Sequence, residues 1–502
     1  MSDRYRLVLL SFLMLFVELA LIRWTGSNVF YLSYFSNFVL LGSFLGIGLG
    51  FLRAKSNFDL FSYGILLLAF LIGFVLAFPV TVNRSGSDLI YFGGPPSGLP
   101  IWVVLPVIFL AAATVMASIA QGVARAFIRF EPLEAYRLDI LGSLAGIVVF
   151  SLLAFAGASP IVWGTVAAAT FLVLYLPSLR LIHVAAALAI LLMLGKESFD
   201  PTNSWSPYYK IALINYRNGW ISLNVNGIPH QWITSVAEVK KTHSLYVIPY
   251  ERLRSNPLNN VLVVGAGNGI DVAIALASGA KHVDAVEIDP RIYAIGRRLN
   301  PDHPYEDPRV TAYVDDGRAF LQRSTTKYDL ILFALPDSLT VVSGQSSLRL
   351  ESYLFTLGAM SAARAHLRSG GAFAMYNDYR QSWLLDRFAN TLDVVYGQPP
   401  CVDSIGTTGR FAVLTVGLEP GDVACATVWH PSALGALPLP VDDDRPFPYL
   451  RYPAIPPLYL ISLGLILIVS LLAVRMAAGP LRQMHEYLDL FFMGAAFLLL
   501  ET

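Results

Sequence analysis

The apolar residues of this chain form long runs near both ends and short runs in the middle. A transmembrane helix needs about 20 predominantly apolar residues to cross about 30 Å of hydrocarbon. The pattern predicts seven spans before residue 195, over 5–24, 29–52, 58–80, 100–124, 138–157, 160–177 and 179–195. The last two runs are short and meet at Pro177-Ser178, so they form either one hairpin or two tilted spans.

The middle of the chain, about 196–452, has a different character, because polar residues return and the apolar runs shorten to strand length. Residues 453–502 are apolar again, with one further span over 455–474 and the start of another over 488–500. Either this last segment is partial, or the chain is a fragment of a longer protein. We expect a transmembrane domain over 1–195, a soluble domain over 196–452 and C-terminal transmembrane segments over 453–502.

Composition favours a multi-pass integral membrane protein, which we expect to lie in the bacterial inner (plasma) membrane. Hydrophobic residues make up 55% of the chain and charged residues only 14%, whereas soluble domains carry about 25% charged residues. Lys+Arg and Asp+Glu are equal at 35 each, so no basic excess is available to neutralise phosphates of a nucleic acid. We expect the lipid bilayer and a small-molecule substrate as partners. His and Cys show no metal-ligand spacing, and we expect no metal.

Basic residues near the predicted spans indicate orientation, since Lys and Arg concentrate in cytoplasmic loops. With the amino end inside, ten such residues lie at cytoplasmic ends and two, Arg23 and Arg84, lie outside. Seven spans then place the soluble domain outside the cytoplasm, but the domain lies inside if 160–195 does not cross twice. A disulfide between Cys401 and Cys425 would support the outer placement.

Ionisable residues within hydrocarbon cost about 2.5–3.5 kcal/mol each on insertion scales. Glu18 and Asp139 fall within apolar runs, as does His183. They form either a polar path between helices or internal pairs with Arg23 and Arg137, with Asp139 near the membrane surface. The second span also carries a glycine at every fourth position, at Gly42, Gly46 and Gly50. These glycines share one helix face and predict close approach of a neighbouring helix.

The soluble region contains a nucleoside-binding signature. A β-branched run, Val261–Val264, leads into Gly265-Ala266-Gly267-Asn268-Gly269 and then into an apolar helix pattern over 270–278. Glycines at such a position allow a tight strand-to-helix turn and close approach of a ligand. The next predicted strand, 283–286, ends at Glu287. A carboxylate at the end of the second strand can bind both hydroxyls of a ribose.

Further strand and helix patterns follow the glycine loop. We predict strands over 310–314, 328–333 and 372–376, with a helix at about 348–368. This alternation predicts a parallel sheet with ligands beyond the carboxyl ends of its strands. The nucleoside-binding candidates lie after three of these strands: Gly265, Gly267, Asn268, Gly269, Glu287, Asp316 and Gly317. The loop lacks the Lys-Ser/Thr pair of a P-loop.

These motifs resemble the spermidine synthase (polyamine aminopropyltransferase) family over roughly 205–420. The resemblance rests on 262–269, Val286-Glu287-Ile288-Asp289, 307–310, Asp316-Gly317, 327–331 and the hairpin-like 223–227. Similarity at 136–143 and 443–447 points to the membrane-fused branch of the family. It implies a multi-pass helical bundle joined to a Rossmann-like domain of the S-adenosylmethionine-dependent methyltransferase and spermidine synthase type. A small β-hairpin region, about 205–235, would precede the nucleoside-binding core, about 258–420.

The resemblance implies that the domain binds S-adenosylmethionine or decarboxylated S-adenosylmethionine as a co-substrate and forms a homodimer. Glu287 would hold the ribose and Asp316 the adenine amino group. Asn268 and Ala334 replace two carboxylates of the family, so the catalytic site is degenerate for classical polyamine synthesis. Asp337 and His243 are the catalytic residues that this comparison retains.

Three functions remain open at this point. The first is a membrane-bound transferase that uses S-adenosylmethionine or its decarboxylated form. The second is a transporter or lipid-handling protein with a sensory nucleoside-binding domain, and the third is a non-catalytic binding module. Loop charge argues against the first, because the donor is made in the cytoplasm, whereas the glycine loop, Glu287 and Asp316 argue for it.

Overall fold

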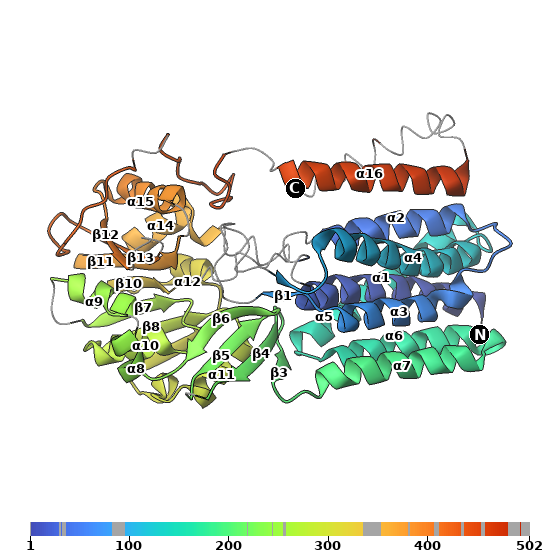
Figure 1. Ribbon diagram of the computed structural model, residues 1–502, viewed down its shortest axis with the longest axis horizontal. Helices are drawn as coiled ribbons and strands as arrows, with labels where there is room; N and C mark the ends of the chain where they lie inside the picture. The colour runs from blue at the N-terminus through green and yellow to red at the C-terminus, as the bar shows by residue number, and fades with distance from the viewer. Residues whose placement is uncertain are drawn as a thin grey trace.

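The computed structural model describes residues 2–29, 32, 37–82, 96–217, 219–242, 244–254, 258–334, 353–379, 382–405, 411–432, 436–452, 457–479 and 492. Helices packed side by side form one end of the molecule and an α/β domain forms the other (Figure 1). The amino terminus lies at the end of the helical bundle that points away from the α/β domain.

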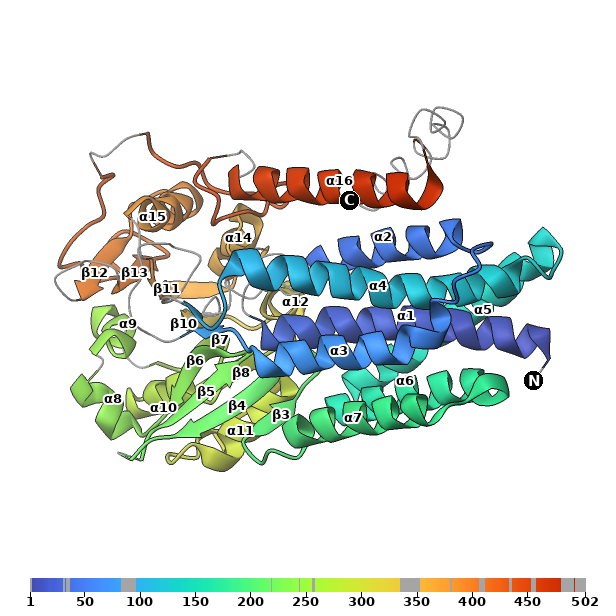
Figure 2. The same ribbon diagram turned by 45° about the vertical axis from the view of Figure 1, so that its right-hand side comes forward.

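Within the described residues, seven α-helices precede the α/β domain, and each overlaps one of the predicted spans. Their crossing of a membrane stays a prediction. They are α1 (Asp3–Asn28), α2 (Phe38–Leu52), α3 (Gly64–Ala77), α4 (Ile101–Phe127), α5 (Pro132–Phe155), α6 (Pro160–Tyr175) and α7 (Leu181–Ser198). A short antiparallel pair, β1 (Thr81–Val82) and β2 (Pro96–Ser97), joins α3 to α4. After the α/β domain, α16 (Pro457–Ala478) lies beside α2 (Figure 2). Among the described residues, six helices are long and apolar enough to cross a membrane, whereas α2 and α3 are shorter.

Glycine brings the bundle helices into backbone contact. A Cβ atom at Gly42 would lie 3.2 Å from the carbonyl oxygen of Phe109 in α4, and one at Gly46 would overlap the Ala113 carbonyl. The close approach predicted from the glycine spacing is therefore confirmed for α2 and α4. Gly142 and Gly146 of α5 meet the backbone of α1 in the same way.

We expect Gly46→Ala to destabilise the bundle by about 1–3 kcal/mol, because the added methyl group would force α2 away from α4. Gly48→Ala is the matched control, since nothing lies within 4 Å of a Cβ atom at Gly48 on the same helix. Thermal unfolding of the detergent-solubilised protein measures both variants. Equal melting temperatures for the two variants would contradict this packing.

A four-stranded antiparallel sheet connects the bundle to the larger domain. Its strands are β3 (Asn203–Trp205), β4 (Lys210–Asn215), β5 (Ile221–Val225) and β6 (Ile228–Ile233), in that spatial order. The predicted hairpin corresponds to β5 and β6, which are joined by Asn226-Gly227 with φ of 49° and 77°. This pair of left-handed residues matches the twist of a tight hairpin turn.

The large sheet has seven strands in the order β12-β13-β11-β10-β7-β8-β9. They are β7 (Asn260–Val264), β8 (His282–Glu287), β9 (Val310–Val314), β10 (Tyr328–Ala334), β11 (Leu367–Asp378), β12 (Cys401–Ile405) and β13 (Phe411–Gly417). The five strands predicted from the sequence, β7 to β11, run parallel as expected. The sheet is mixed because β13, which was not predicted, runs antiparallel to both β11 and β12. Only five residues separate β12 from β13, and a parallel connection needs a dozen or more.

Both faces of the large sheet are covered by helices. Val261 and Val263 of β7 belong to the hydrophobic cluster that includes α10 (Ile270–Ala277), whereas Leu262 and Val264 belong to the cluster on the opposite face. The second cluster includes residues of α12 (Gly317–Arg323), α14 (Leu357–Ala365) and α15 (Ser382–Tyr396). The helix predicted over 348–368 corresponds to α14, and its residues 348–352 lie outside the described part. From β7 the chain continues to β8 and β9 on one side of the sheet and then returns to β10 on the other side. The point between β7 and β10 is therefore the topological switch point, where doubly wound sheets bind ligands.

Candidate functional site

The glycine loop between β7 and α10 depends on backbone conformations that only glycine adopts easily. Gly265, Gly267 and Gly269 have φ angles of 79°, 55° and 89°. The amides of Gly265 and Ala266 donate to the Val286 carbonyl oxygen, which fixes the loop beside the end of β8. Three glycines in this spacing are thus required by the turn itself.

Glu287 is the carboxylate that the loop surrounds. One of its oxygens accepts a hydrogen bond from the Gly267 amide at 2.7 Å, and the other accepts one from the Asp289 amide at 2.9 Å. Glu287 is 7% exposed, and burial raises its pKa to about 7 against the opposing effect of these amides. The carboxylate is therefore held at the carboxyl end of β8, between the glycine loop and α11 (Pro290–Leu299).

Asn268 connects the glycine loop to the small sheet. Its side-chain amide donates to the Trp232 carbonyl at 2.9 Å and accepts from the Ile270 amide at 3.1 Å. The backbone amide of Asn268 donates to the Gln231 side chain at 2.9 Å. Asn268 is completely buried, so its side chain fixes the loop, and its role toward a ligand stays a prediction.

Asp316 and Gly317 lie where β9 leads into α12. The Asp316 carboxylate accepts from the Ala319 amide at 2.8 Å and so caps α12. A Cβ atom at Gly317 would overlap the side chain of Val264, which lets α12 begin directly beside β7. Asp316 is half-buried, and its second oxygen is not needed for the cap.

Tyr208 is a site residue that the sequence did not indicate. It comes from the loop between β3 and β4, and burial is the main reason that its pKa is raised. The charges of Asp289, Asp316 and Glu287 raise that pKa further. Glu287 and Asp316 thus lie at the ends of the paired strands β8 and β9, and their joint role toward a ligand stays a prediction. Asp289, which donates its amide to Glu287, and Tyr208 are additional residues of the candidate site.

Hydrogen bonds connect this constellation to the first bundle helix. The Arg23 guanidinium of α1 donates to the carbonyl oxygens of Ser206 and Pro207. The Ser206 hydroxyl donates to the Asp289 carboxylate, and the Asp289 amide donates to Glu287. Burial raises the pKa of Asp289 although Ser206 and backbone amides oppose this effect. The carboxyl end of β8 consequently faces the bundle.

A second set of contacts fixes the same junction. Glu197 at the end of α7 accepts from the Trp24 indole at 2.8 Å and from Lys210 of β4 at 2.5 Å. Lys210 also donates to the Asn28 side chain at 2.8 Å. These hydrogen bonds and the ion pair between Glu197 and Lys210 hold the small sheet against the ends of α1 and α7.

Part of the α/β domain matches known proteins in sequence. A spermine/spermidine synthase domain model matches residues 246–393. The polyamine aminopropyltransferase of Alkaliphilus metalliredigens (strain QYMF) is 38% identical over 86 residues, which are 16% of this chain and 30% of that protein. The enzyme of the same name from Pectobacterium carotovorum subsp. carotovorum (strain PC1) is 29% identical over 149 residues, 28% of this chain and 49% of that protein.

The α/β domain is spermidine synthase-like. Its fold is Rossmann-like, with a mixed sheet covered by helices on both faces. The solved spermidine synthase from Thermotoga maritima aligns with a TM-score of 0.33 and 14% identity, over 52% of this chain and 86% of that one. The chain spans about half or less of the length of the two curated relatives named above.

Two predicted catalytic residues of the spermidine synthase-like domain, Asp337 and His243, lie outside the described residues. Ala334, the other departure from the family pattern, is buried at the end of β10.

Asp271 in the first turn of α10 is a further buried acid, which accepts a hydrogen bond from the Tyr376 hydroxyl. Burial raises the pKa of Asp271 to about 7. Among the described residues, no group of three His, Cys, Asp or Glu could hold a metal ion.

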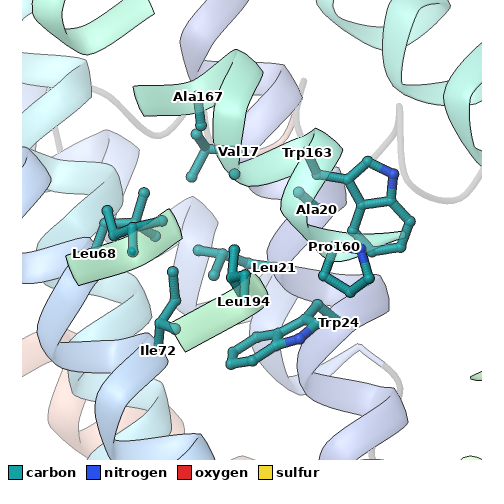
Figure 3. A pocket seen from close by; sticks show the side chains of 12 residues that line it. Val17, Ala20, Leu21, Trp24, Leu68, Ile72, Pro160, Trp163, Ala167 and Leu194 are labelled. Atoms are coloured by element: carbon teal, nitrogen blue, oxygen red, sulfur yellow. The ribbon is translucent and has the colours of Figure 1, made fainter. Parts of the chain in front are cut away.

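The structure does not bring Glu18 and Asp139 together. Asp139 accepts from the Ser11 hydroxyl at 2.6 Å, and Ser11 precedes Glu18 by seven residues, about 10 Å along α1. Among the ion pairs of the described residues, neither Glu18–Arg23 nor Asp139–Arg137 occurs. Arg23 binds the Ser206 loop, and one Glu18 oxygen has no partner. A nearby cavity of about 40 Å³ between α1, α3, α6 and α7 is lined mainly by apolar side chains, including Trp24 and Trp163 (Figure 3).

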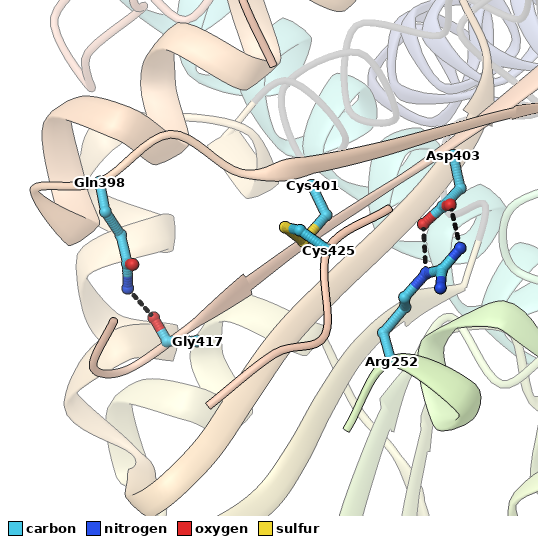
Figure 4. The surroundings of a disulfide bond; sticks show 6 residues. All are labelled: Arg252, Gln398, Cys401, Asp403, Gly417 and Cys425. Carbon is cyan, nitrogen blue, oxygen red and sulfur yellow. Dashed lines mark hydrogen bonds and ion pairs between the residues drawn. A yellow bond between two sulfur atoms is a disulfide. The ribbon is translucent and has the colours of Figure 1, made fainter. Parts of the chain in front are cut away.

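The spermidine synthase-like domain contains a disulfide between Cys401 and Cys425. Cys401 begins the edge strand β12, and Cys425 lies in the segment that follows β13 (Figure 4). Close to it, Arg252 forms a bidentate ion pair with Asp403 of β12, with N–O distances of 2.9 and 2.5 Å. The disulfide between Cys401 and Cys425, which the sequence left open, is therefore present.

Proposed function

We propose that this protein is a membrane-bound transferase whose spermidine synthase-like domain binds S-adenosylmethionine or its decarboxylated form. The observation that carries the proposal is the position of Glu287. Its two oxygens meet the amides of Gly267 and Asp289 at the carboxyl end of β8, and Asp316 follows the neighbouring strand. A carboxylate at this position of a doubly wound sheet suits the hydroxyls of a ribose.

The roles of the residues follow from their places. Glu287 would accept hydrogen bonds from the ribose, and the free oxygen of Asp316 would accept one from the adenine amino group. The three glycines of the loop have no side chains that would prevent close approach of the donor, and the Gln231 side chain packs against Gly267. In the transfer step, the acceptor attacks the carbon next to the sulfonium sulfur, and the C–S bond breaks. The neutral thioether nucleoside then leaves and the acceptor loses a proton.

The acceptor that we propose is not a diamine. Asn268 has no charge and its side chain is engaged by Trp232 and Ile270, so it offers no carboxylate to an ammonium group. Ala334 also has no charge at the end of β10. A cationic amine needs carboxylates both for binding and for accepting the proton from its attacking nitrogen as a general base. A neutral acceptor fits this site better.

We further propose that the spermidine synthase-like domain lies outside the cytoplasm. Nine basic residues lie at the bundle end away from the domain: Arg4, Arg6, Arg53, Lys55, Arg125, Arg129, Arg137, Arg180 and Arg475. Arg23 and Lys196 lie at the domain end, whereas Arg84 and Arg482 lie outside the described residues. This bias and the disulfide both support the outer placement. The donor must then cross the membrane, so donor use and placement need separate tests.

Transfer is tested with the full-length protein in lipid nanodiscs. S-adenosylmethionine or its decarboxylated form is supplied with either putrescine or a bacterial extract of neutral metabolites and lipids. We expect release of S-adenosylhomocysteine or methylthioadenosine with the extract, and no more than background release with putrescine. Stimulation by putrescine would contradict the neutral acceptor. No release of either nucleoside under any condition would contradict the transferase.

A further inference from the structure

A polar cavity of about 200 Å³ lies at the bundle end that points away from the spermidine synthase-like domain. It is enclosed by the start of α1, the end of α4, the segment before α3 and the turn between α6 and α7. The polar residues that line it include Arg6, Asp59, Ser62, Arg125, Arg129 and Ser178. Three arginines thus face one aspartate around a single cavity.

The arginines differ in how fully they are engaged. Arg125 pairs with Asp59 at 2.6 Å and donates to three backbone carbonyls, so its guanidinium is occupied. Arg129 pairs with Asp3 at the exposed rim, at 2.7 Å. Arg6 is half-buried and donates to the Leu174 carbonyl at 3.2 Å, and no carboxylate of the described chain pairs with it. A guanidinium has five N–H donors, so most of those of Arg6 remain available.

We propose that this cavity binds a phosphate group, held by Arg6 with Arg129 at the rim. A half-buried cation without a carboxylate favours an anion in the adjacent space, and the planar guanidinium matches phosphate oxygens well. Carboxylates do not supply this charge, since Asp59 and Asp3 already have arginine partners. An anionic lipid headgroup and free inorganic phosphate share this chemistry. The proposal is independent of nucleoside binding in the other domain.

The test uses the full-length protein in a neutral detergent. Phosphatidylglycerol, phosphatidylcholine and inorganic phosphate are added separately, and lipid retention by native mass spectrometry is measured with the melting temperature. We expect phosphatidylglycerol to bind more tightly than phosphatidylcholine, or inorganic phosphate alone to stabilise the protein. The first result identifies a lipid headgroup as the ligand, and the second identifies free phosphate.

Arg6→Gln should weaken the binding of whichever probe is active by about tenfold, and Arg129→Gln should weaken it less. Arg6→Lys keeps the charge and should restore part of the affinity. Arg4→Gln is the matched control, because Arg4 lies on the same helix but does not line the cavity. Its guanidinium pairs with the Glu134 carboxylate at a distance of 2.7 Å. Equal binding by wild type, Arg6→Gln and Arg129→Gln, or no effect of either phosphate probe, would overturn the proposal.

Discussion

Glu287→Gln should weaken binding of the adenosyl donor by roughly ten- to hundred-fold, the expected loss for hydrogen bonds to a charged group. Each Glu287 oxygen accepts a hydrogen bond from a backbone amide, one from Gly267 and one from Asp289. A glutamine would turn its NH₂ group toward one of these donors, so the loop and the ribose contacts would both suffer. Calorimetry with the full-length variant measures the change. Glu419→Gln, an exposed substitution after β13, is the control.

The same residue should make donor binding depend on pH. Burial raises the pKa of Glu287 from 4.5 to about 7, so the neutral form stabilises the fold. That stabilisation is complete below about pH 4.5 and is lost as pH rises through about 7. Since the ionised form accepts ribose hydroxyls best, donor affinity should rise through this range and Glu287→Gln should remove the rise. A pH-independent affinity in the wild type would contradict the assigned role.

Alkaline phosphatase fused after Asp200, just beyond α7, should be active, and green fluorescent protein at the same point should be dark. The reason is that nine basic residues lie at the opposite end of the bundle, which the positive-inside rule assigns to the cytoplasm. Fusions after Lys55, between α2 and α3, should give the reverse result. These all-or-none signals measure the side of the membrane directly.

The disulfide gives an independent readout of the same placement. Cys401 and Cys425 should resist maleimide labelling in cells until a reductant is added, because the bond persists only in an oxidising compartment. Fluorescence of the Asp200 fusion together with freely labelled cysteines would reverse the proposed orientation. The donor would then be available directly, and the transferase would need no transport step.

Local sequence signals predicted the core of the site because its constraints are local. The strand Val261–Val264 needs apolar residues on two covered faces, and the turn that follows needs glycine at positive φ. Glu287 and Asp316 were predicted for the same reason, since Glu287 ends β8 and Asp316 lies two residues beyond β9. These features depend on a few neighbouring residues and are therefore visible in a single sequence.

The long-range part of the site could not be predicted in this way. Arg23 and Ser206 are 183 residues apart, and Ser206 and Asp289 are 83 apart. Nothing in the local pattern around Tyr208 shows that the charges of three carboxylates raise its pKa. The antiparallel β13 was also missed, since its apolar run looks like that of a buried parallel strand. The contacts of Arg23 and Ser206 depend on the packing of the bundle end against the small sheet, which no local pattern reveals.

Direct titration of the wild-type, full-length protein with methylthioadenosine, S-adenosylmethionine and decarboxylated S-adenosylmethionine tests the central claim. Calorimetry at pH 8, where Glu287 is ionised, should show saturable binding of at least one of them at one site per chain. Guanosine provides the control for the base. If none of the three adenosyl compounds produces heat above the guanosine control, the domain does not bind a nucleoside donor.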